Sequence, residues 1–467
     1  MGKSKPAGGL PNVVIVGGGF GGLQAARALR RAAVRVTLID RTNYHLFQPL
    51  LYQVATAGLS PGDIAAPIRS ILARQANAQV LMREVTGVDA AEQQVRMGDM
   101  LVPYDYLVLA TGARHGYFGH EEWEPFAPGL KTISDSTAIR REILLAFEAA
   151  EMAAVTGSSH RDAKGSSQGV APILTFAIVG AGPAGVEMAG SIGELARHAL
   201  ASDFRHIDPA SARVVLLEAA PRILGAYPED LALKAQRALE RMGVEVRLNT
   251  PVEEITADGI QAGGDWISTR NVVWMAGVLA SPAGEWIGAD TDRSGRVKVE
   301  RDLSVLGHPD IFVIGDTARF EQGGQPVPGV APAAMQQGRY VASVIQSKVS
   351  KRPAPPPFHY RDKGSLATVG RSYAIISMGP LRLTGFVAWL AWLVIHIFFL
   401  IGFRNRVLVL FQWIWAYLTW GRGVRLITPP SKSEIKKAEA ERREDKRTED
   451  RWAEDRRRGE RRAESER

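Results

Sequence analysis

Three glycines follow a short apolar segment near the start of the chain, at the spacing G-x-G-x-x-G. They are Gly17, Gly19 and Gly22, which come after an expected strand at 13–16 and open an Ala- and Leu-rich segment typical of a helix. Glycines at this spacing permit a tight turn, a close approach of the backbone to a pyrophosphate, and close packing of helix on strand. The N-terminus of such a helix offers free N–H groups and a positive dipole end to phosphate oxygens.

An acidic residue ends the next expected strand. Residues 36–39 are mostly apolar and Asp40 follows them, near the spacing of roughly 20 residues at which a carboxylate can bond ribose hydroxyls. A glycine triplet alone would also fit a plain strand, turn and helix. Two strands, a helix and the acid together predict a dinucleotide site.

The same pattern occurs a second time. Gly180, Gly182 and Gly185 follow an expected strand at 176–179, and Glu218 ends the partner strand after a polar loop. An acid in this place favours a ribose 2′-hydroxyl and repels a 2′-phosphate, so NADH is expected rather than NADPH. Two such units in one chain predict two nucleotides, a bound flavin and a passing nicotinamide.

Three more segments are expected to be buried strands that end in tight turns, where open parallel sheets bind their ligands. The segments are 104–113, 271–278 and 310–318. Gly277 lies near the end of the second, and Asp316 follows Gly315 in the third. The other interpretation of Asp316 is an ordinary turn residue.

Composition limits the class of protein. The chain has 467 residues, a net charge of +8 and a pI near 9.6, so it is expected to be attracted to anionic surfaces such as lipid. There is no zinc spacing and no basic sheet with interleaved aromatics, which disfavours nucleic acid, and no metal site is predicted. The sequence contains no cysteine, which excludes disulfides, thiolate nucleophiles and iron–sulfur ligation. The N-terminal segment lacks the apolar core of a secretory signal, so the body of the protein is expected in the cytosol.

An apolar, aromatic region lies near the C-terminus. Residues 383–403 carry no formal charge and are long enough to span a bilayer, and a second apolar stretch continues to Trp420. The alternatives are a spanning helix, a dimer interface and a hairpin of helices lying in the membrane surface. The hairpin is favoured because amphipathic aromatics and flanking arginines suit the headgroup level. Those aromatics are Trp389, Trp392, Trp413, Trp415, Tyr417 and Trp420.

Four longer motifs occur one after another along the chain, and their order is informative about the family. They are NYHLFQPLLYQVATAGLSPGDIAAPIR after Asp40, then GPAGVEMAGSIGEL, PGVAPAAMQQGRYVA and FHYRDKGSLATVGR. From Asn12 to about Thr428 the chain therefore resembles the flavoproteins with two dinucleotide-binding domains and, among them, the type II NADH dehydrogenases. Disulfide reductases and sulfide:quinone reductases of this architecture need cysteines, which this chain lacks.

The resemblance implies an activity. It implies hydride transfer from NADH to FAD and then reduction of a membrane quinone, without proton pumping, since no series of membrane-buried acids and lysines is present. Two alternatives remain open. One is a ferredoxin or rubredoxin reductase of related fold, and the other is a membrane-tethered flavoprotein that senses NADH or acts as a scaffold.

The resemblance also implies a division of the chain. The fold class is α/β, with two Rossmann-like dinucleotide-binding domains and a C-terminal membrane-associated helical region. The expected parts are an FAD-binding domain at 1–150 and 286–350, a flexible loop at 151–170, an NADH-binding domain at 171–285, a membrane-anchoring region at 351–428, and a charged tail at 429–467.

Cofactor contacts are implied residue by residue. FAD is expected at Gly17, Gly19, Gly22, Asp40, Val85, Thr111, Gly112, Asp316 and Ala331. NADH is expected at Gly180, Gly182, Gly185, Glu218 and Gly277.

Three residues are implied in catalysis. Glu187 matches a glutamate that faces the flavin and quinone region, although a carboxylate placed on the helix dipole is the plainer interpretation. Lys363 matches a lysine near the flavin or quinone; the alternative is a solvated surface lysine. Gln336 matches the second glutamine of the quinone-side motif, but the first is replaced by Pro332, which has no N–H to donate.

The expected partners are NADH, a membrane quinone and a lipid surface, with a homodimer carried over from the resemblance. The expected location is the cytoplasmic face of a membrane, with peripheral, monotopic attachment through the C-terminal region.

Overall fold

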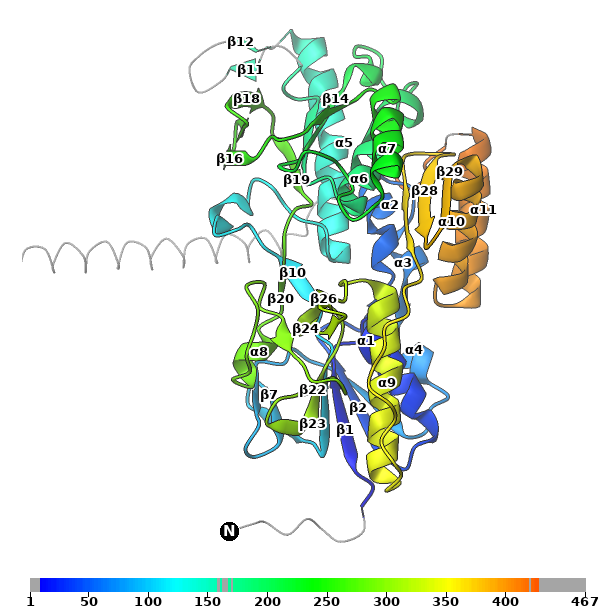
Figure 1. Ribbon diagram of the computed structural model, residues 1–467. Coiled ribbons are helices and arrows are strands. Elements are labelled where there is room, and N and C mark those ends of the chain that lie inside the picture. The colour runs from blue at the N-terminus through cyan, green and yellow to red at the C-terminus, as the bar shows by residue number, and fades with distance from the viewer. Residues whose placement is uncertain (1–8, 158–159, 162–166, 169–170, 420, 428–467) are drawn as a thin grey trace, which may run out of the picture. The chain divides into compact units, whose positions relative to one another are not determined.

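The computed structural model describes residues 9–157, 160–161, 167–168, 171–419 and 421–427 (Figure 1). The chain forms one compact unit through Arg425 and a second from Leu426 onward, and all that follows concerns the first. The charged tail at 429–467 lies outside the described residues, as do residues 158–159, 162–166 and 169–170 of the loop expected at 151–170. Residues 151–156 of that range belong instead to the end of a long helix, α5 (Ile133–Thr156), which stops at Gly157 in the left-handed conformation.

A six-stranded sheet carries the first glycine loop. Its order is β22-β23-β9-β1-β2-β5, and all neighbours are parallel except β22 and β23. The central strands β9, β1 and β2 are largely apolar and buried on both faces, as expected of a parallel sheet. Residues from both parts of the expected FAD domain share this sheet. The bounds are β1 Asn12–Val16, β2 Arg35–Asp40, β5 Ala78–Met82, β9 Tyr106–Leu109, β22 Ser304–Val305 and β23 His308–Val313.

Two helices, α1 (Phe20–Ala28) and α9 (Ala331–Val349), pack against each other beside this sheet (Figure 1). Their contact is backbone on backbone, because a Cβ added at Gly338 would lie 2.2 Å from the carbonyl oxygen of Gly21. Both helices begin at the carboxyl ends of strands. Their N-termini therefore meet at the edge of the sheet where a ligand is expected.

A second parallel sheet carries the second glycine loop. Its order is β15-β14-β13-β19, and helix α6 (Pro183–Glu194) follows β13 as α1 follows β1. The antiparallel pair β10–β20 lies where the chain passes between the two sheets. The remaining bounds here are β13 Thr175–Val179, β14 Arg213–Leu217, β15 Val244–Arg247, β19 Asn271–Trp274, β10 Ala113–His115, β20 Val278–Ala280 and α7 Glu229–Arg241.

Shorter elements complete the unit. Three-stranded antiparallel sheets are formed by β6 Gly87–Asp89, β7 Gln94–Met97 and β8 Met100–Pro103, by β16 Val252–Thr256, β17 Gly259–Ala262 and β18 Asp265–Ser268, and by β27 Ser365–Thr368, β28 Ala374–Met378 and β29 Leu381–Gly385. Short pieces are β3 Tyr44–Leu46, α2 Leu51–Ala55, α3 Pro61–Ile64, β4 Ala65–Pro67, α4 Ile68–Leu72, α8 Ala283–Trp286, β21 Val297–Lys298, β24 Ala318–Arg319, β25 Glu321–Gln322 and β26 Gln325–Pro326.

The apolar C-terminal region forms two helices in contact, α10 (Phe386–Phe399) and α11 (Phe403–Thr419). The uncharged stretch 383–403 is not one helix, because its first residues belong to β29, which ends at Gly385 with φ 80°. Gly402, with φ 91°, separates the two helices. Within the described part of the chain, no helix combines the length and the hydropathy needed to cross a membrane.

Candidate functional site

The first glycine loop has the geometry of a phosphate-binding turn. Gly17 has φ +104°, and a Cβ at Gly22 would lie 1.9 Å from the carbonyl oxygen of Gly17. A side chain is therefore excluded at both positions by backbone. Gly19, at the N-cap of α1, has no atom within 4 Å of an added Cβ and no side-chain cap. The first N–H groups of α1 thus face open space, which suits a pyrophosphate.

Asp40 closes the same loop from β2. Its Oδ2 accepts the N–H of Gly18 at 2.6 Å, while its Oδ1 accepts the N–H and the hydroxyl of Thr42, each at 2.7 Å. The carboxylate is held beside the turn and only partly buried. This is the position from which an acid reaches the ribose of a dinucleotide.

The second glycine loop repeats this geometry. Gly180 has φ +97°, a Cβ at Gly185 would again lie 1.9 Å from the carbonyl oxygen of Gly180, and Gly182 is again open. Glu218 accepts the N–H of Ala181 at 2.8 Å, as Asp40 accepts that of Gly18. The two halves therefore present the same cradle at the ends of two separate parallel sheets.

Hydroxyl groups join the turns that follow β9 and β23. Thr111 Oγ1 lies 2.5 Å from Ser281 Oγ and 3.2 Å from Thr317 Oγ1, and Thr317 donates to the carbonyl oxygen of Gly112 at 3.0 Å. Asp316 precedes Thr317 in the same short turn. Thr111, Gly112 and Asp316 are thus brought together at one sheet edge; their contact with a cofactor stays a prediction.

Helix α9 begins beside that turn. Gln337, almost fully buried, accepts the N–H of Gly315 at 2.6 Å through its Oε1 and ties the first turns of α9 to the Asp316 turn. Ala331 is the first residue of the helix, and Pro332 occupies its first turn, where a proline ring is tolerated. The N-cap residue Val330 supplies no side-chain cap.

The amide of Gln336 is engaged at both ends. Its Nε2 donates to the carbonyl oxygen of Arg361, and its Oε1 accepts the Arg361 N–H, each at 3.0 Å. Gln336 thus holds the extended segment that leads to Lys363, whose side chain is exposed. The Gln336 amide could contact a substrate only if these two hydrogen bonds were broken.

Glu187 lies on α6, buried against β27. Its Oε1 accepts the N–H of Thr368 at 3.3 Å and faces the Thr368 hydroxyl at 3.5 Å. Burial raises the pKa of the Glu187 carboxyl to about 8, and the two bonds from Thr368 oppose that shift. The carboxyl is therefore mostly protonated at neutral pH, which is a state suited to donating a proton.

Two expected contacts lie apart from these groups. Val85 is buried in the apolar cluster on one face of the first sheet. Gly277 has φ +65° beside the β10–β20 pair, where a Cβ would meet the carbonyl oxygen of Gly116 at 2.5 Å. Packing against neighbouring residues accounts for both Val85 and Gly277 in this structure.

The partners of Glu187 do not follow from the sequence. The Tyr52 hydroxyl lies 3.1 Å from Thr368 Oγ1, although 316 positions separate the two residues. Each falls inside one of the quoted motifs, but no spacing could pair them. Gln337 and Ser281 were missed for the same reason, since their roles depend on contacts between distant segments.

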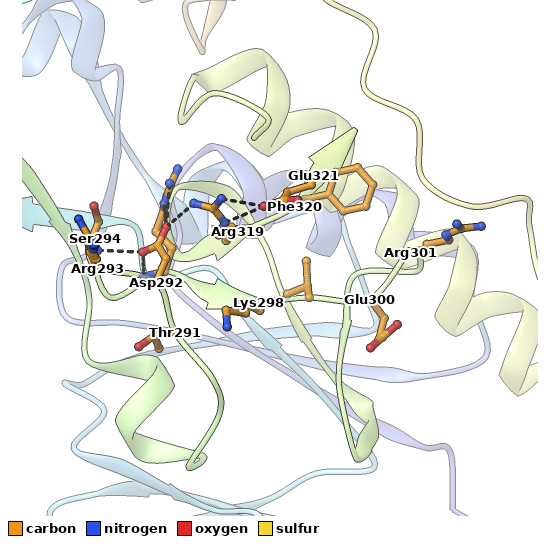
Figure 2. Close-up of a pocket in the computed structure, with 12 residues that line it drawn as sticks. Thr291, Asp292, Arg293, Ser294, Lys298, Glu300, Arg301, Arg319, Phe320 and Glu321 are labelled. Atoms are coloured by element: carbon orange, nitrogen blue, oxygen red, sulfur yellow. Dashed lines mark hydrogen bonds and ion pairs between the residues drawn. The ribbon is translucent and has the colours of Figure 1, made fainter. Parts of the chain in front are cut away.

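A surface pocket lies elsewhere, in the second part of the expected FAD domain (Figure 2). Its central acid, Asp292, forms ion pairs with Arg296 at 2.8 Å and Arg319 at 3.1 Å, and Arg319 also pairs with Glu321 at 2.7 Å (Figure 2). None of the expected site residues lines it. Its central charges are already neutralised, so the glycine loops and Glu187 form the candidate site.

The chain matches the pyridine nucleotide-disulphide oxidoreductase family over residues 11–338. It is 48% identical over 444 residues to the type II NADH:quinone oxidoreductase NdhA of Mycobacterium tuberculosis, covering 91% of each chain. It is 31% identical to the type II NADH:quinone oxidoreductase of Haemophilus influenzae, over 83% of this chain and 93% of that one. The structure of NDH2 from Plasmodium falciparum in complex with NADH shares the fold, with a TM-score of 0.78 at 18% identity, over 90% of this chain and 100% of that one.

Both cradles therefore fit the nucleotides of this family. The open position at each helix start, the excluded side chains behind it and the acid beside it suit FAD in one half and NADH in the other. Although the broad family is named for disulfide chemistry, this chain has no cysteine to perform it. Its fold, its two dinucleotide loops and its relatives together establish that the chain belongs to the type II NADH:quinone oxidoreductase family.

Proposed function

We propose that this protein oxidises NADH and reduces a membrane quinone by way of FAD, without pumping protons. The observation that carries the proposal is the repeated cradle: two open glycine loops with the same backbone geometry, each with its own acid, in a chain without cysteine. The balanced reaction is NADH + H⁺ + quinone → NAD⁺ + quinol. FAD, when bound, accepts the hydride and supplies two electrons to the quinone.

The first half would hold FAD. The backbone of Gly17 to Gly22 and the start of α1 would bind its pyrophosphate, and Asp40 its adenosine ribose. Thr111, Gly112 and Asp316 would contact it at the carboxyl ends of β9 and β23. The start of α9, at Ala331, would direct N–H groups toward it.

The second half would hold NADH in the same manner. The start of α6, behind Gly182, would bind the pyrophosphate, and Glu218 would bond the 2′-hydroxyl of the adenosine ribose. Both oxygens of Glu218 accept backbone N–H groups, from Ala181 and Ala220. The carboxylate is thereby kept in one orientation, where its charge would repel a 2′-phosphate.

Glu187 would hold the proton that the reaction consumes. Hydride transfer brings one proton with its two electrons, so a quinol needs one more from the medium. A buried carboxyl with a pKa near 8 is protonated at neutral pH and can be recharged within each cycle. Lys363 and Gln336 would act at the same side, Gln336 by holding the segment at Arg361 that leads to Lys363.

The outer face of α10 and α11 would bind the surface of a membrane, which we infer to be its cytoplasmic face. Large apolar side chains stand exposed along both helices, which is unusual for a face in contact with water. They include Phe386, Val387, Val394, Phe398, Phe411 and Leu418. A quinone dissolved in lipid would then meet the flavin without leaving the bilayer. A second copy of the chain is the other partner that could cover this face.

Steady-state assays of the purified protein in detergent would test the proposed activity. We expect NADH oxidation that depends on a short-chain quinone, with one FAD bound per chain. NADH oxidation by ferricyanide but by no quinone would leave a flavoprotein with a different acceptor. Pro332 is the feature that makes this alternative worth testing, because it removes a donor from the quinone side.

A further inference from the structure

A chain of hydrogen bonds runs from helix α11 to Glu187. Trp413 Nε1 donates to Gln53 Oε1 at 2.8 Å, and Gln53 Nε2 donates to the Tyr52 hydroxyl at 3.0 Å. The Tyr52 hydroxyl lies 3.1 Å from Thr368 Oγ1, which lies 3.5 Å from Glu187 Oε1. Four segments that are distant in sequence, on α11, α2, β27 and α6, are joined in this way.

The direction of the chain follows from its first member. An indole N–H can only donate, so Trp413 requires the carbonyl side of the Gln53 amide to face it. The amide nitrogen of Gln53 then points at Tyr52 and makes the Tyr52 oxygen an acceptor. The single proton of Tyr52 is left for Thr368, and that of Thr368 is left for Glu187.

We propose that Trp413 is a positioning residue that fixes the direction of this chain, so that packing of α11 keeps the Thr368 hydroxyl donating to the Glu187 carboxyl group. The proposal rests on the role given to Glu187 above and adds a link between that acid and the C-terminal helices. It assigns Gln53 and Tyr52 as the groups that carry the link.

Other ionisable groups around Glu187 stay the same when Trp413 is changed. Tyr52 on α2 and Tyr227 ahead of α7 are buried near it and sense its charge. Glu194 lies two turns along α6 and is paired with Arg422 at 3.2 Å. Arg371 contacts Glu194 through its backbone N–H. A change at Trp413 therefore reaches Glu187 through the hydrogen-bonded chain and not through a lost charge.

Trp413→Phe removes the indole donor and keeps an aromatic ring beside Trp392. The Gln53 amide is then free to turn over, so Tyr52 can donate to Gln53, Thr368 to Tyr52, and a protonated Glu187 to Thr368. Protonated Glu187 can then donate a hydrogen bond to Thr368, which the Trp413 donor prevents in the native protein. The pKa of Glu187 should therefore rise further in the variant.

Infrared difference spectroscopy of the FAD-loaded protein would measure this directly. The carbonyl stretch of protonated Glu187 is identified as the band absent from Glu187→Gln, and its loss with increasing pH gives the midpoint. We expect a midpoint near pH 8 in the native protein and an upward shift of roughly 0.5 to 1 pH unit in Trp413→Phe, the effect of about one hydrogen bond. Trp415→Phe, two residues along α11 and exposed, is the matched control and should leave the midpoint unchanged.

A second variant covers the case in which Trp413→Phe does not fold. Gln53→Leu removes the amide that orients Tyr52 without adding a charge, so Tyr52 is no longer held as a donor to Thr368 and the midpoint should also rise. An unmoved midpoint in whichever variants fold would overturn the proposal. The infrared band is measured without turnover, so its shift does not depend on enzymatic activity. If the protein reduced no quinone but the Glu187 band shifted as expected in Trp413→Phe, the proposed function would be refuted and the link from Trp413 to Glu187 would stand.

Discussion

Single residues define each nucleotide cradle in this protein. Gly17 and Gly180 adopt a backbone conformation that side chains disfavour, while Gly22 and Gly185 leave no room for a Cβ. Asp40 and Glu218 each accept an N–H from the residue that follows the first glycine of their loop. The selectivity of the two halves should therefore be adjustable one side chain at a time.

Glu218→Gln tests the nicotinamide preference. The variant keeps an acceptor for the N–H of Ala181 but loses the charge that would repel a 2′-phosphate. We expect the ratio of kcat/KM for NADH over NADPH to fall by on the order of 10-fold, the worth of one charge-assisted contact. Glu229→Gln, an exposed acid on α7, is the control. An unchanged ratio would show that Glu218 does not select the nucleotide.

Glu187→Gln tests the burial of the acid through stability. The folded-state pKa of Glu187 is raised from 4.5 to about 8, so between these values the native state binds a proton that the unfolded state has lost. Native stability should fall as pH rises through this window and level off above it. The variant has no carboxyl at this position and therefore lacks this loss of stability with pH. The free energy of unfolding of the variant, minus that of the native protein, should therefore increase by about 4 kcal/mol at most from pH 5 to pH 9. Urea unfolding at several pH values measures it, and a pH-independent difference would contradict a buried, protonated Glu187.

Helices α1 and α9 are the elements that set the shape of the first cradle. They touch through backbone, Gly338 against Gly21, and both begin at the ligand edge of the sheet. Helix α9 is also tied there by Gln337 to Gly315. Any change in the separation of the two helices should therefore alter both the stability of the fold and the binding of the flavin.

Gly338→Ala tests this contact. The added methyl would lie 2.2 Å from the Gly21 carbonyl oxygen, so α9 must move away from α1. We expect a loss of about 1 to 3 kcal/mol in stability and faster release of FAD on dilution. Ser347→Ala, a small substitution near the end of the same helix, should do neither. If Gly338→Ala matched the native protein in thermal stability and in flavin retention, the close contact between the two helices would be ruled out.

The whole molecule combines a net charge of +8 with an apolar face on α10 and α11. Anionic lipid should attract the charge, and apolar burial should retain the protein once bound. Flotation with anionic vesicles should therefore succeed, and high salt should weaken the binding without abolishing it.

A double variant, Val394→Glu with Phe398→Glu, locates the membrane-binding face. The two residues lie one turn apart on α10 and are largely exposed, so the change should abolish flotation while the protein stays folded. Leu306→Glu, at an even more exposed position between β22 and β23, should float normally. Normal flotation of the double variant would remove α10 from the membrane contact, and a change from dimer to monomer instead would assign this face to a second copy.

Local patterns predicted local structure well. Both glycine loops, their flanking strands and the acids beside them follow from short-range backbone requirements, so they could be read from the chain. The boundary of α10 could not, because Gly385 ends a strand inside an unbroken apolar stretch. The engagement of Gln336 with Arg361, and the link from Trp413 to Glu187, depend on contacts between distant segments and required the structure.

The most direct test of the central claim separates the two half-reactions. In anaerobic stopped-flow, the FAD-loaded protein is mixed with NADH, and the reduced protein is then mixed with a short-chain ubiquinone or a menaquinone analogue. The proposed function predicts fast flavin bleaching by NADH, followed by fast reoxidation by at least one quinone. Bleaching followed by no reoxidation with either quinone would contradict it.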